Sequence, residues 1–430
     1  MTAVIGILNR HAVALAADSA VTIGGENGNK IFNTANKIFT LSKYHPVAIM
    51  IYNAASFIET PWEVIIKAYR DQLEDRYFNS LVEYKDDFLK FLIDNDYFIS
   101  LDGQKNVMKG FIYNSIGEII NNIASREKLD IQTDSSNHEL LFEKLVNEIR
   151  IIINNLYASS EELSSFSGYS IPEFLVFSDK CVEEIISASF STSKNQDVIR
   201  LFNELFFTYV KRNQFNRTWS GLVFSGYGAS EIFPKLVSIK IAEVIDNRVR
   251  YFVDEVHDIG EGKMAASIVP FAQRDVIDTL ITGINSDLND TFIQSIHEFL
   301  MKYNVDIAAM LQNDKPVLAK KILNIDVVKI VDELRKNMNE VKSAKHINPT
   351  VHTVALLSKE DLAEMAESLI YLTFLKRRIS FAEESVGGPV DVALISKGEG
   401  FVWIKRKHYF KSDLNPQFFQ NYFKPNFIKP

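Results

Sequence analysis

MTAVIGI, residues 1–7, consists after Met1 of small and β-branched residues, a composition typical of a β-strand. A second apolar run, AVALAA at residues 12–17, follows a short polar break, so the two runs predict a hairpin that turns at residues 9–11. KIFTL at residues 37–41 and VAIMIY at residues 47–52 predict another hairpin. Because the run at 47–52 is apolar on both faces, we expect an interior strand that is covered on both sides.

The rest of the chain follows in blocks of helix and strand. Helical periodicity dominates residues 63–216 and returns over 288–341. We also expect a helix that begins after Ser267 and runs to residue 284, and another from an N-cap at Ser358 to Arg378. Strand patterns occupy residues 21–23, 30–33, 221–226, 237–244, 248–256, 390–396 and 401–405. Segregated antiparallel strands with helices outside them indicate a layered α+β sandwich.

The composition is that of an ordinary globular protein, with 430 residues, 47% hydrophobic and 24% charged. The net charge of −8 provides no attraction for nucleic acid, and no apolar run approaches the ~20 residues of a membrane span. We find no phosphate-binding loop, zinc spacing or calcium loop, and we expect no cofactor and no metal. The single cysteine, Cys181, excludes an intramolecular disulfide and is typical of a reducing compartment. The expectation is a cytoplasmic protein that binds neither nucleic acid nor membrane.

Several segments, taken in order, resemble a proteasome β-type subunit and the related bacterial two-component protease of the same fold. The opening segments are TAVIGI (2–7), VALAADS (13–19), NKIFTL (36–41) and VAIMI (47–51), and SVGGPVDVALI (385–395) resembles the family's closing hairpin. Asp18 follows Thr2 by the family's usual interval. The resemblance implies a four-layer αββα sandwich of the N-terminal nucleophile (Ntn) hydrolases with large helical insertions. Its core would comprise residues 1–75, 217–284 and 358–410, with helical insertions at 76–216 and 285–357 and a tail at 411–430.

The resemblance also implies a threonine nucleophile. Removal of Met1 would give Thr2 a free α-amine, which serves as the base for the hydroxyl of the same residue. An α-amine has an ordinary pKa of about 7.7–8.0, and a nearby cation keeps it unprotonated near neutral pH. Lys37 is the candidate for that cation, and Asp18 would hold it in place. Lys30 is a competing candidate, because the interval from Thr2 to Lys37 is longer than the family's usual one.

Three further positions complete the implied site. A backbone N–H near Asn53 would stabilise the oxyanion, and such donors are typically worth about 3 kcal/mol of barrier. Asparagine stands there in place of the usual glycine, and it tolerates unusual φ/ψ values better than most residues. The acidic and serine partners of the amine fall near Glu383 and Ser385. A related family serine lies near Ser267, which we otherwise interpret as a helix N-cap.

The implied function is cleavage of amide bonds in peptides by a threonine-type peptidase. The family also implies self-association into rings, and it allows an ATPase unfoldase as a partner. Two alternatives stay open. The missing glycine at Asn53 favours an inactive scaffold subunit, and the helical insertions would suit an amidase that encloses a small molecule.

Overall fold

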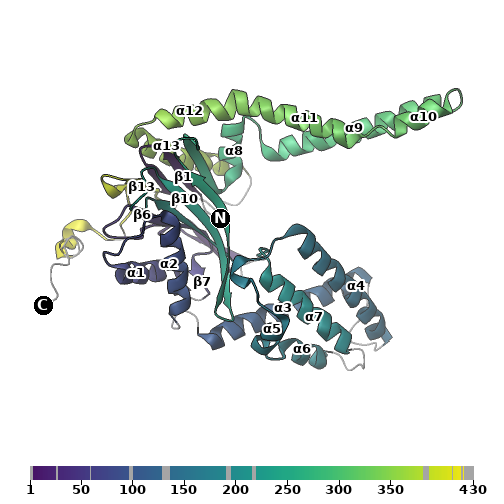
Figure 1. Ribbon diagram of the computed structural model, residues 1–430, viewed down its shortest axis with the longest axis horizontal. Helices are drawn as coiled ribbons and strands as arrows, with labels where there is room; N and C mark the ends of the chain where they lie inside the picture. Colours follow the sequence, from purple (N-terminus) through teal and green to yellow (C-terminus); the bar gives the residue numbers. More distant parts are fainter. Residues whose placement is uncertain are drawn as a thin grey trace. The chain divides into compact units, whose positions relative to one another are not determined.

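The computed structural model of the chain describes residues 3–25, 28–58, 60–95, 100–127, 136–189, 195–215, 219–380, 387–408, 410–417 and 420. They form an α+β protein with antiparallel sheets, in which helices occupy separate blocks of the chain (Figure 1). The chain divides into two compact units. The first comprises Met1–Ile38, Glu231–Lys235 and His257–Pro430, and the second comprises Phe39–Ser230 and Leu236–Val256.

The sheet of the first unit has the strand order β12-β1-β2-β13-β14. The predicted opening hairpin is confirmed as β1 (Val4–Asn9) and β2 (Val13–Ala17), and the closing pair as β13 (Asp391–Ser396) and β14 (Gly400–Lys405). All these neighbours pair antiparallel. Every residue of β1, β2 and β13 is buried, as expected for strands in the interior of a sheet.

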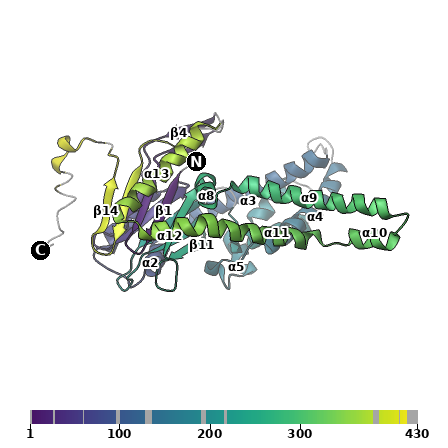
Figure 2. The same ribbon diagram turned by 90° about the horizontal axis from the view of Figure 1, so that it is seen from above.

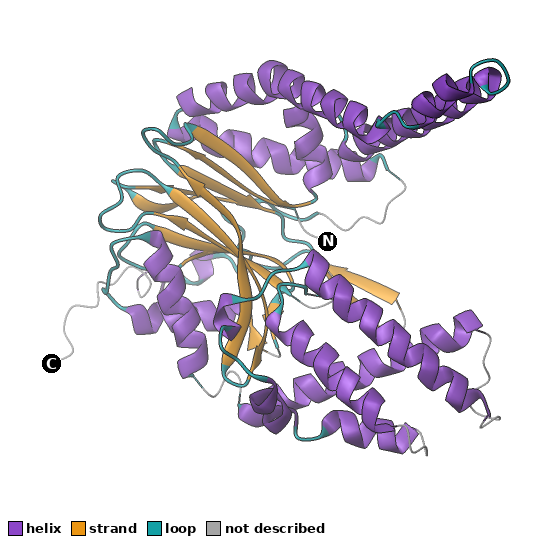
Figure 3. Cartoon of the chain, turned by 45° about the vertical axis from the view of Figure 1, so that its right-hand side comes forward, coloured by secondary structure: helices purple, strands orange, loops and turns teal. Residues whose placement is uncertain are grey.

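Helices α12 (Asn348–Leu356) and α13 (Lys359–Arg378) pack on one face of this sheet (Figure 3). This face is formed by alternating residues, Ile5 and Ile7 of β1 and Ala14 and Ala16 of β2. The small alanine side chains of β2 allow α13 to lie close to the strand. As predicted, Ser358 caps α13, and three basic residues in the last turn complement the helix dipole.

Asn9 explains why the first hairpin turns where it does. Its buried Oδ1 accepts hydrogen bonds from the N–H groups of His11 (2.9 Å) and Ala12 (3.3 Å). Its Nδ2 donates to the carbonyls of Val354 (3.0 Å) and Leu357 (2.9 Å) at the end of α12. One amide side chain therefore fixes the turn and attaches it to the covering helix.

The prediction of a helix directly after Ser267 is wrong. Residues Ala266–Ala272 form β12, and helix α8 begins only at Arg274 and ends at Thr282. Ser267 pairs with Leu8 and Pro270 with Ile5 in the register of β1. Proline is tolerated in this strand because β12 lies at the edge of the sheet, where no further strand requires its missing N–H. Tertiary pairing overrides the local helix signal here.

A small antiparallel hairpin of β3 (Val21–Gly25) and β4 (Gly28–Phe32) also belongs to the first unit and confirms the short strands predicted there. The rest of this unit is an arm, which we define as residues 286–342. It contains α9 (Ser286–Leu311), α10 (Pro316–Leu323) and α11 (Val327–Lys342), and a π-helical turn (Ser343–Ile347) joins it to α12. Helix α9 lies beside α10 and α11 (Figure 2).

The sheet of the second unit has the order β11-β10-β9-β6-β5. Strand β6 (Val47–Asn53) is buried over its first six residues and pairs antiparallel with β9 (Ser220–Gly226), which confirms the predicted interior strand. Helices α1 (Trp62–Leu73) and α2 (Leu81–Asp94) bury their apolar faces in the core cluster that contains β6 and β9. The remaining strands are β5 (Ile38–Thr40), β7 (Ser56–Phe57), β8 (Thr60–Pro61), β10 (Lys235–Ile245) and β11 (Arg248–Asp258).

A helical block completes the second unit. Its helices are α3 (Leu101–Glu127), α4 (Ser136–Ser159), α5 (Ile171–Ser178), α6 (Cys181–Ser189) and α7 (Asn195–Lys211), and they share one apolar core. Cys181 lies in that core, and burial raises the pKa of its thiol, as is typical of a structural cysteine. Among the described helices of the whole chain, none combines the length and apolar character needed to cross a membrane.

Arg250 of β11 ties this block to the sheet of the second unit. The guanidinium is completely buried and forms an ion pair with Glu243 of β10. It also donates to the carbonyls of Val210 (3.0 Å) and Tyr209 (2.9 Å) in the last turn of α7, and to that of Gln214 (3.1 Å) just beyond the helix. The last carbonyls of a helix lack the N–H donors of a following turn, so Arg250 acts as a cap of α7 together with the N–H of Arg212, which donates to the carbonyl of Tyr209 at 3.2 Å.

We expect Arg250→Met to lower the free energy of unfolding by about 3–5 kcal/mol, because a carboxylate and several carbonyls lose a buried cationic donor. Urea denaturation followed by circular dichroism measures the change. The control is Arg335→Met, which removes an exposed ion pair with Asp332 and should cost less than about 1 kcal/mol. Equal effects of the two substitutions would contradict the capping role.

Candidate active site around Asp18 and Lys37

Asp18 lies directly beside the start of β1. It follows the last residue of β2, and its N–H donates to the carbonyl of Ala3 at 3.0 Å. In return, the N–H of Ala3 donates to Oδ1 of Asp18 at 2.9 Å. Strands β1 and β2 are neighbours in the sheet, and their last backbone pair is Val4 with Ala17. Ala3 and Asp18 are the next pair, in which the carboxylate of Asp18 takes the place of a backbone carbonyl as acceptor. The carboxylate is thereby held at the residue that follows Thr2.

Lys37 completes a buried ion pair with this carboxylate. Its Nζ lies 2.5 Å from Oδ1 of Asp18 and 2.6 Å from the carbonyl oxygen of Ala20. The side chains of Lys37 and Asp18 are only 4% and 0% exposed. The same carboxylate oxygen therefore accepts from both Lys37 and the N–H of Ala3.

The second carboxylate oxygen holds a distant part of the chain. Oδ2 of Asp18 accepts from the N–H groups of Ala20 (3.3 Å) and Gly387 (3.2 Å). Ser19 adds two bonds to the same segment, because its N–H donates to the carbonyl of Gly387 (3.2 Å) and its Oγ to that of Pro389 (2.6 Å). The next residue, Gly388, has a φ of +79°, and a Cβ there would lie 2.9 Å from Cβ of Asn33, so the backbone requires glycine.

Burial lowers the pKa of the Lys37 ammonium below its ordinary value of 10.5, because removal from water disfavours the charged form. The charge of Asp18 and its hydrogen bond oppose this shift and raise the pKa. A lysine in this position has a compact positive charge and loses its proton more readily than a lysine in water. Such perturbed groups cluster at functional sites, although structural ion pairs share the property.

A second lysine–aspartate pair lies close enough to influence Lys37, and the sequence analysis did not single it out. Asp391 begins β13, where it pairs with Ala17, and it is buried. Lys407 forms an ion pair with it, and the N–H of Lys407 donates to Asp391 Oδ1 at 2.8 Å. The charge of Lys407 lowers the pKa of Lys37, and that of Asp391 raises it. An acidic residue inside the apolar run VDVALI was the available signal.

The structure thus brings together two of the predicted site residues, Asp18 and Lys37. The competing candidate, Lys30, lies on β4 with an exposed side chain whose Nζ is 5.1 Å from the centre of the Phe32 ring. Thr2, Glu383 and Ser385 lie outside the described residues.

Ser267, the family-related serine, lies apart from Asp18 within the first unit. It pairs with Leu8 near the far end of β1, whereas Asp18 is beside Ala3. At about 3.4 Å per residue, five residues along a strand separate the two ends by roughly 17 Å. Its Oγ is 2.8 Å from Nδ1 of His257.

Asn53, the predicted oxyanion position, ends β6 in the second unit. Its φ of 67° is in the left-handed region, which asparagine tolerates better than most residues. Its Nδ2 donates to the carbonyl of Trp219 at 2.7 Å. The N–H of Ala54 donates to the same carbonyl at 3.2 Å. The backbone at Asn53 thus has a left-handed conformation, and the N–H of the next residue already has an acceptor.

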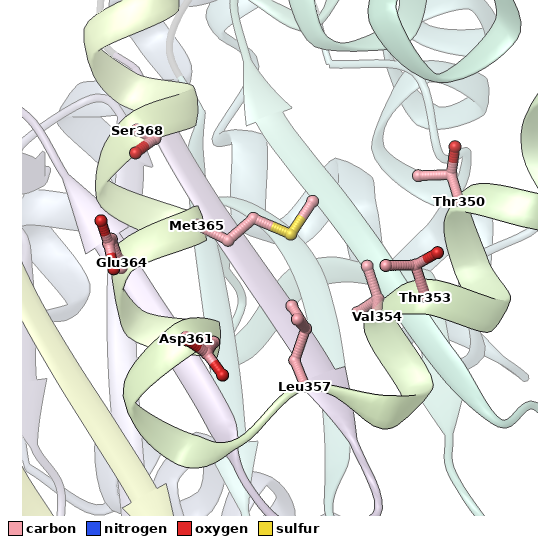
Figure 4. Close-up of a pocket in the computed structure, with 8 residues that line it drawn as sticks. All are labelled: Thr350, Thr353, Val354, Leu357, Asp361, Glu364, Met365 and Ser368. Atoms are coloured by element: carbon pink, nitrogen blue, oxygen red, sulfur yellow. The ribbon is translucent and has the colours of Figure 1, made fainter.

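A groove of about 530 Å³ lies elsewhere in the first unit, between α12 and α13 (Figure 4). Leu357 and Met365 project into the space between these helices, and Asp361 and Glu364 border it. Neither Asp18 nor Lys37 lines this groove. It is therefore separate from the ion-pair site.

No model of a known protein family matches the chain, and no curated protein sequence matches it. Within the described ranges, no group of three or more His, Cys, Asp or Glu side chains could hold a metal ion.

We expect Lys37→Met to lower the free energy of unfolding by about 3–5 kcal/mol, because Asp18 would be left buried without its counter-ion. The control is Lys67→Met, which removes the exposed pair with Glu63 and should cost less than about 1 kcal/mol. Urea denaturation of the three proteins measures both changes. A loss below 1 kcal/mol for Lys37→Met would show that the pair does not organise the fold.

The lowered pKa of Lys37 also predicts a pH dependence. Just below pH 10.5, the unfolded state holds a proton on Lys37 more tightly than the folded state does. The free energy of unfolding should therefore rise with pH through this window. The rise should be smaller in Lys37→Met than in the wild type, whereas Lys67→Met should follow the wild type. Identical curves for the wild type and Lys37→Met would contradict the shift.

Proposed function

We propose that this chain is a threonine-type Ntn hydrolase that cleaves amide bonds in peptides. The observation that carries the proposal is the shared oxygen of Asp18, which accepts both the Lys37 ammonium and the N–H of Ala3. Ala3 is bonded covalently to Thr2, so the buried cation belongs to the part of the chain where the proposed nucleophile begins.

In the proposed reaction, the α-amine of Thr2 accepts the hydroxyl proton as Oγ forms a bond to the amide carbonyl. The amide C–N bond then breaks, and the proton passes from the amine to the leaving nitrogen. Water hydrolyses the resulting ester and frees the hydroxyl. The charge of Lys37 favours the neutral amine at the start, and the buried setting strengthens this effect because fewer water molecules screen it.

The four-layer αββα sandwich is part of the same proposal. Each unit supplies one five-stranded sheet with helices packed against it, which are the two halves that such a fold needs. The large helical segments would then be additions to that core.

An inactive scaffold is the second candidate, and the surroundings of Asn53 favour it. An oxyanion requires N–H donors that are free to turn to the substrate. The N–H of Ala54 is bound to the carbonyl of Trp219 instead. A scaffold would keep the Asp18–Lys37 pair for stability alone.

Labelling with a threonine-directed electrophile separates these candidates. We expect wild-type protein and Thr2→Ser to form a covalent adduct on residue 2, detected by peptide mass spectrometry, and Thr2→Ala to form none. Thr350→Ala, which removes a threonine hydroxyl lining the α12–α13 groove, is the matched control and should label like the wild type. Lys37→Met should label at least tenfold more slowly than the wild type near pH 7, if it remains folded.

Mass spectrometry of the intact protein provides the independent check. The proposal requires that Thr2 is the first residue of the mature chain. A mature chain with Met1 still attached, or wild-type protein without adduct from about pH 6 to 9, would favour the scaffold. Adduct formation without cleavage of any peptide in a mixed library would favour a small-molecule amidase.

A further inference from the structure

The arm carries more apolar surface than its own packing uses. Its internal core comprises Ile293 of α9 with Val327 and Val331 of α11, and Ile296, Leu300, Leu334 and Met338 pack around them. Beside this seam, a second apolar stripe on α9 remains exposed, from 51% to 80% of each side chain. The stripe contains Leu288, Phe292, Phe299, Tyr303 and Met310.

The spacing of these residues places them on one line along the helix. Successive members are four or seven residues apart, with one gap of seven between Phe292 and Phe299 and another between Tyr303 and Met310. The rings of Phe299 and Tyr303 stack with their centres 6.1 Å apart, so these two members of the stripe lie side by side. Heptad-like spacing of this kind is typical of a helix that packs against another helix.

Helix α11 adds to the same face. On α11, the exposed Ile330 and Val341 lie about a quarter of a turn around the helix from the buried seam. The α9 stripe is rotated from the seam of α9 in the same sense and by about the same angle. Since α9 and α11 run in opposite directions in the hairpin, equal offsets bring both sets to one side. We call this side, with its seven exposed apolar residues, the apolar face of the arm.

The size of the apolar face suits a protein interface. A large side chain presents roughly 150–200 Å² when fully accessible, so seven that are about half exposed or more present on the order of 700 Å². This exceeds the usual apolar patch of a monomer, which is about 300–600 Å². It is close to the ~800 Å² that each partner contributes to a stable interface.

The charges of the arm indicate what covers this face. Helix α9 has four acidic residues and one lysine, a net charge of −3. Helices α10 and α11 together have six basic and three acidic residues, a net charge of +3. The two sides of the hairpin therefore carry opposite net charges. If a second arm is rotated by 180° so that the two apolar faces meet, the negative side of each arm can lie against the positive side of the other.

We propose that the apolar face binds the same face of a second copy of this chain, with the two arms parallel. A two-fold axis along the arms places α9 of each copy over α10 and α11 of its partner, which pairs opposite charges. An antiparallel arrangement would place acidic α9 over acidic α9. The proposal is independent of the hydrolase activity, since the arm contains none of the candidate catalytic residues.

Sedimentation velocity of the full chain tests the interface. We expect a dimer at micromolar concentrations, and at least a tenfold weaker association for Phe299→Glu and for Phe292→Glu. Val305→Glu is the matched control: Val305 is 53% exposed on α9 but lies off the stripe, and its substitution should leave the dimer unchanged. A wild-type protein that stays monomeric, or stripe variants that dimerise like the wild type while circular dichroism shows normal helix content, would overturn the proposal.

A spin label at the tip of the arm tests the orientation. Asn313→Cys places the label in the exposed turn after α9, and the buried Cys181 of the otherwise unchanged chain serves as the unlabelled control. Helix α9 has 26 residues and is about 39 Å long. Parallel arms predict a label-to-label distance below about 30 Å. A distance above about 40 Å would show antiparallel arms and overturn the charge argument.

Discussion

The buried pair of Asp18 and Lys37 is the constraint on which the centre of the first unit depends. A carboxylate and an ammonium withdrawn from water are each costly, and they become tolerable only when they meet each other and further hydrogen-bond partners. Asp18 meets this condition with Lys37 and with the N–H groups of Ala3, Ala20 and Gly387. Four distant segments must therefore converge before either charge can be buried.

This convergence has a chemical consequence as well as a structural one. The Lys37 charge is held in a place from which solvent is largely excluded, and its pKa is lowered by burial. The neighbouring Asp391–Lys407 pair adds two further charges of opposite sign. Such an arrangement can set the protonation of an amine that lies nearby, which is why we favour catalysis over a purely structural role.

The helices on the sheets and the helices of the arm differ in how completely they bury their apolar side chains. The helices on the sheets bury their apolar faces within their own unit, as α13 does on β1 and β2. The arm buries only a narrow seam and leaves a second stripe on α9 exposed. A helix with two apolar stripes can bury only one of them against the other side of a helical hairpin. The second stripe stays in contact with water unless another protein surface covers it, which is the physical basis for proposing a partner.

Local patterns in the sequence determined the strands and helices with strong periodicity and clear caps. Examples are the hairpin turning at Asn9, the interior strand β6 and helix α13 with its cap at Ser358. The pattern failed at Ser267, because pairing with β1 outweighed the local helix signal. The sequence offered both Lys37 and Lys30 as the candidate cation, and it did not single out Asp391. Local sequence patterns do not state which charged side chains become buried. Only the tertiary structure decided this, by bringing Lys37 and the segment at Gly387 to one carboxylate.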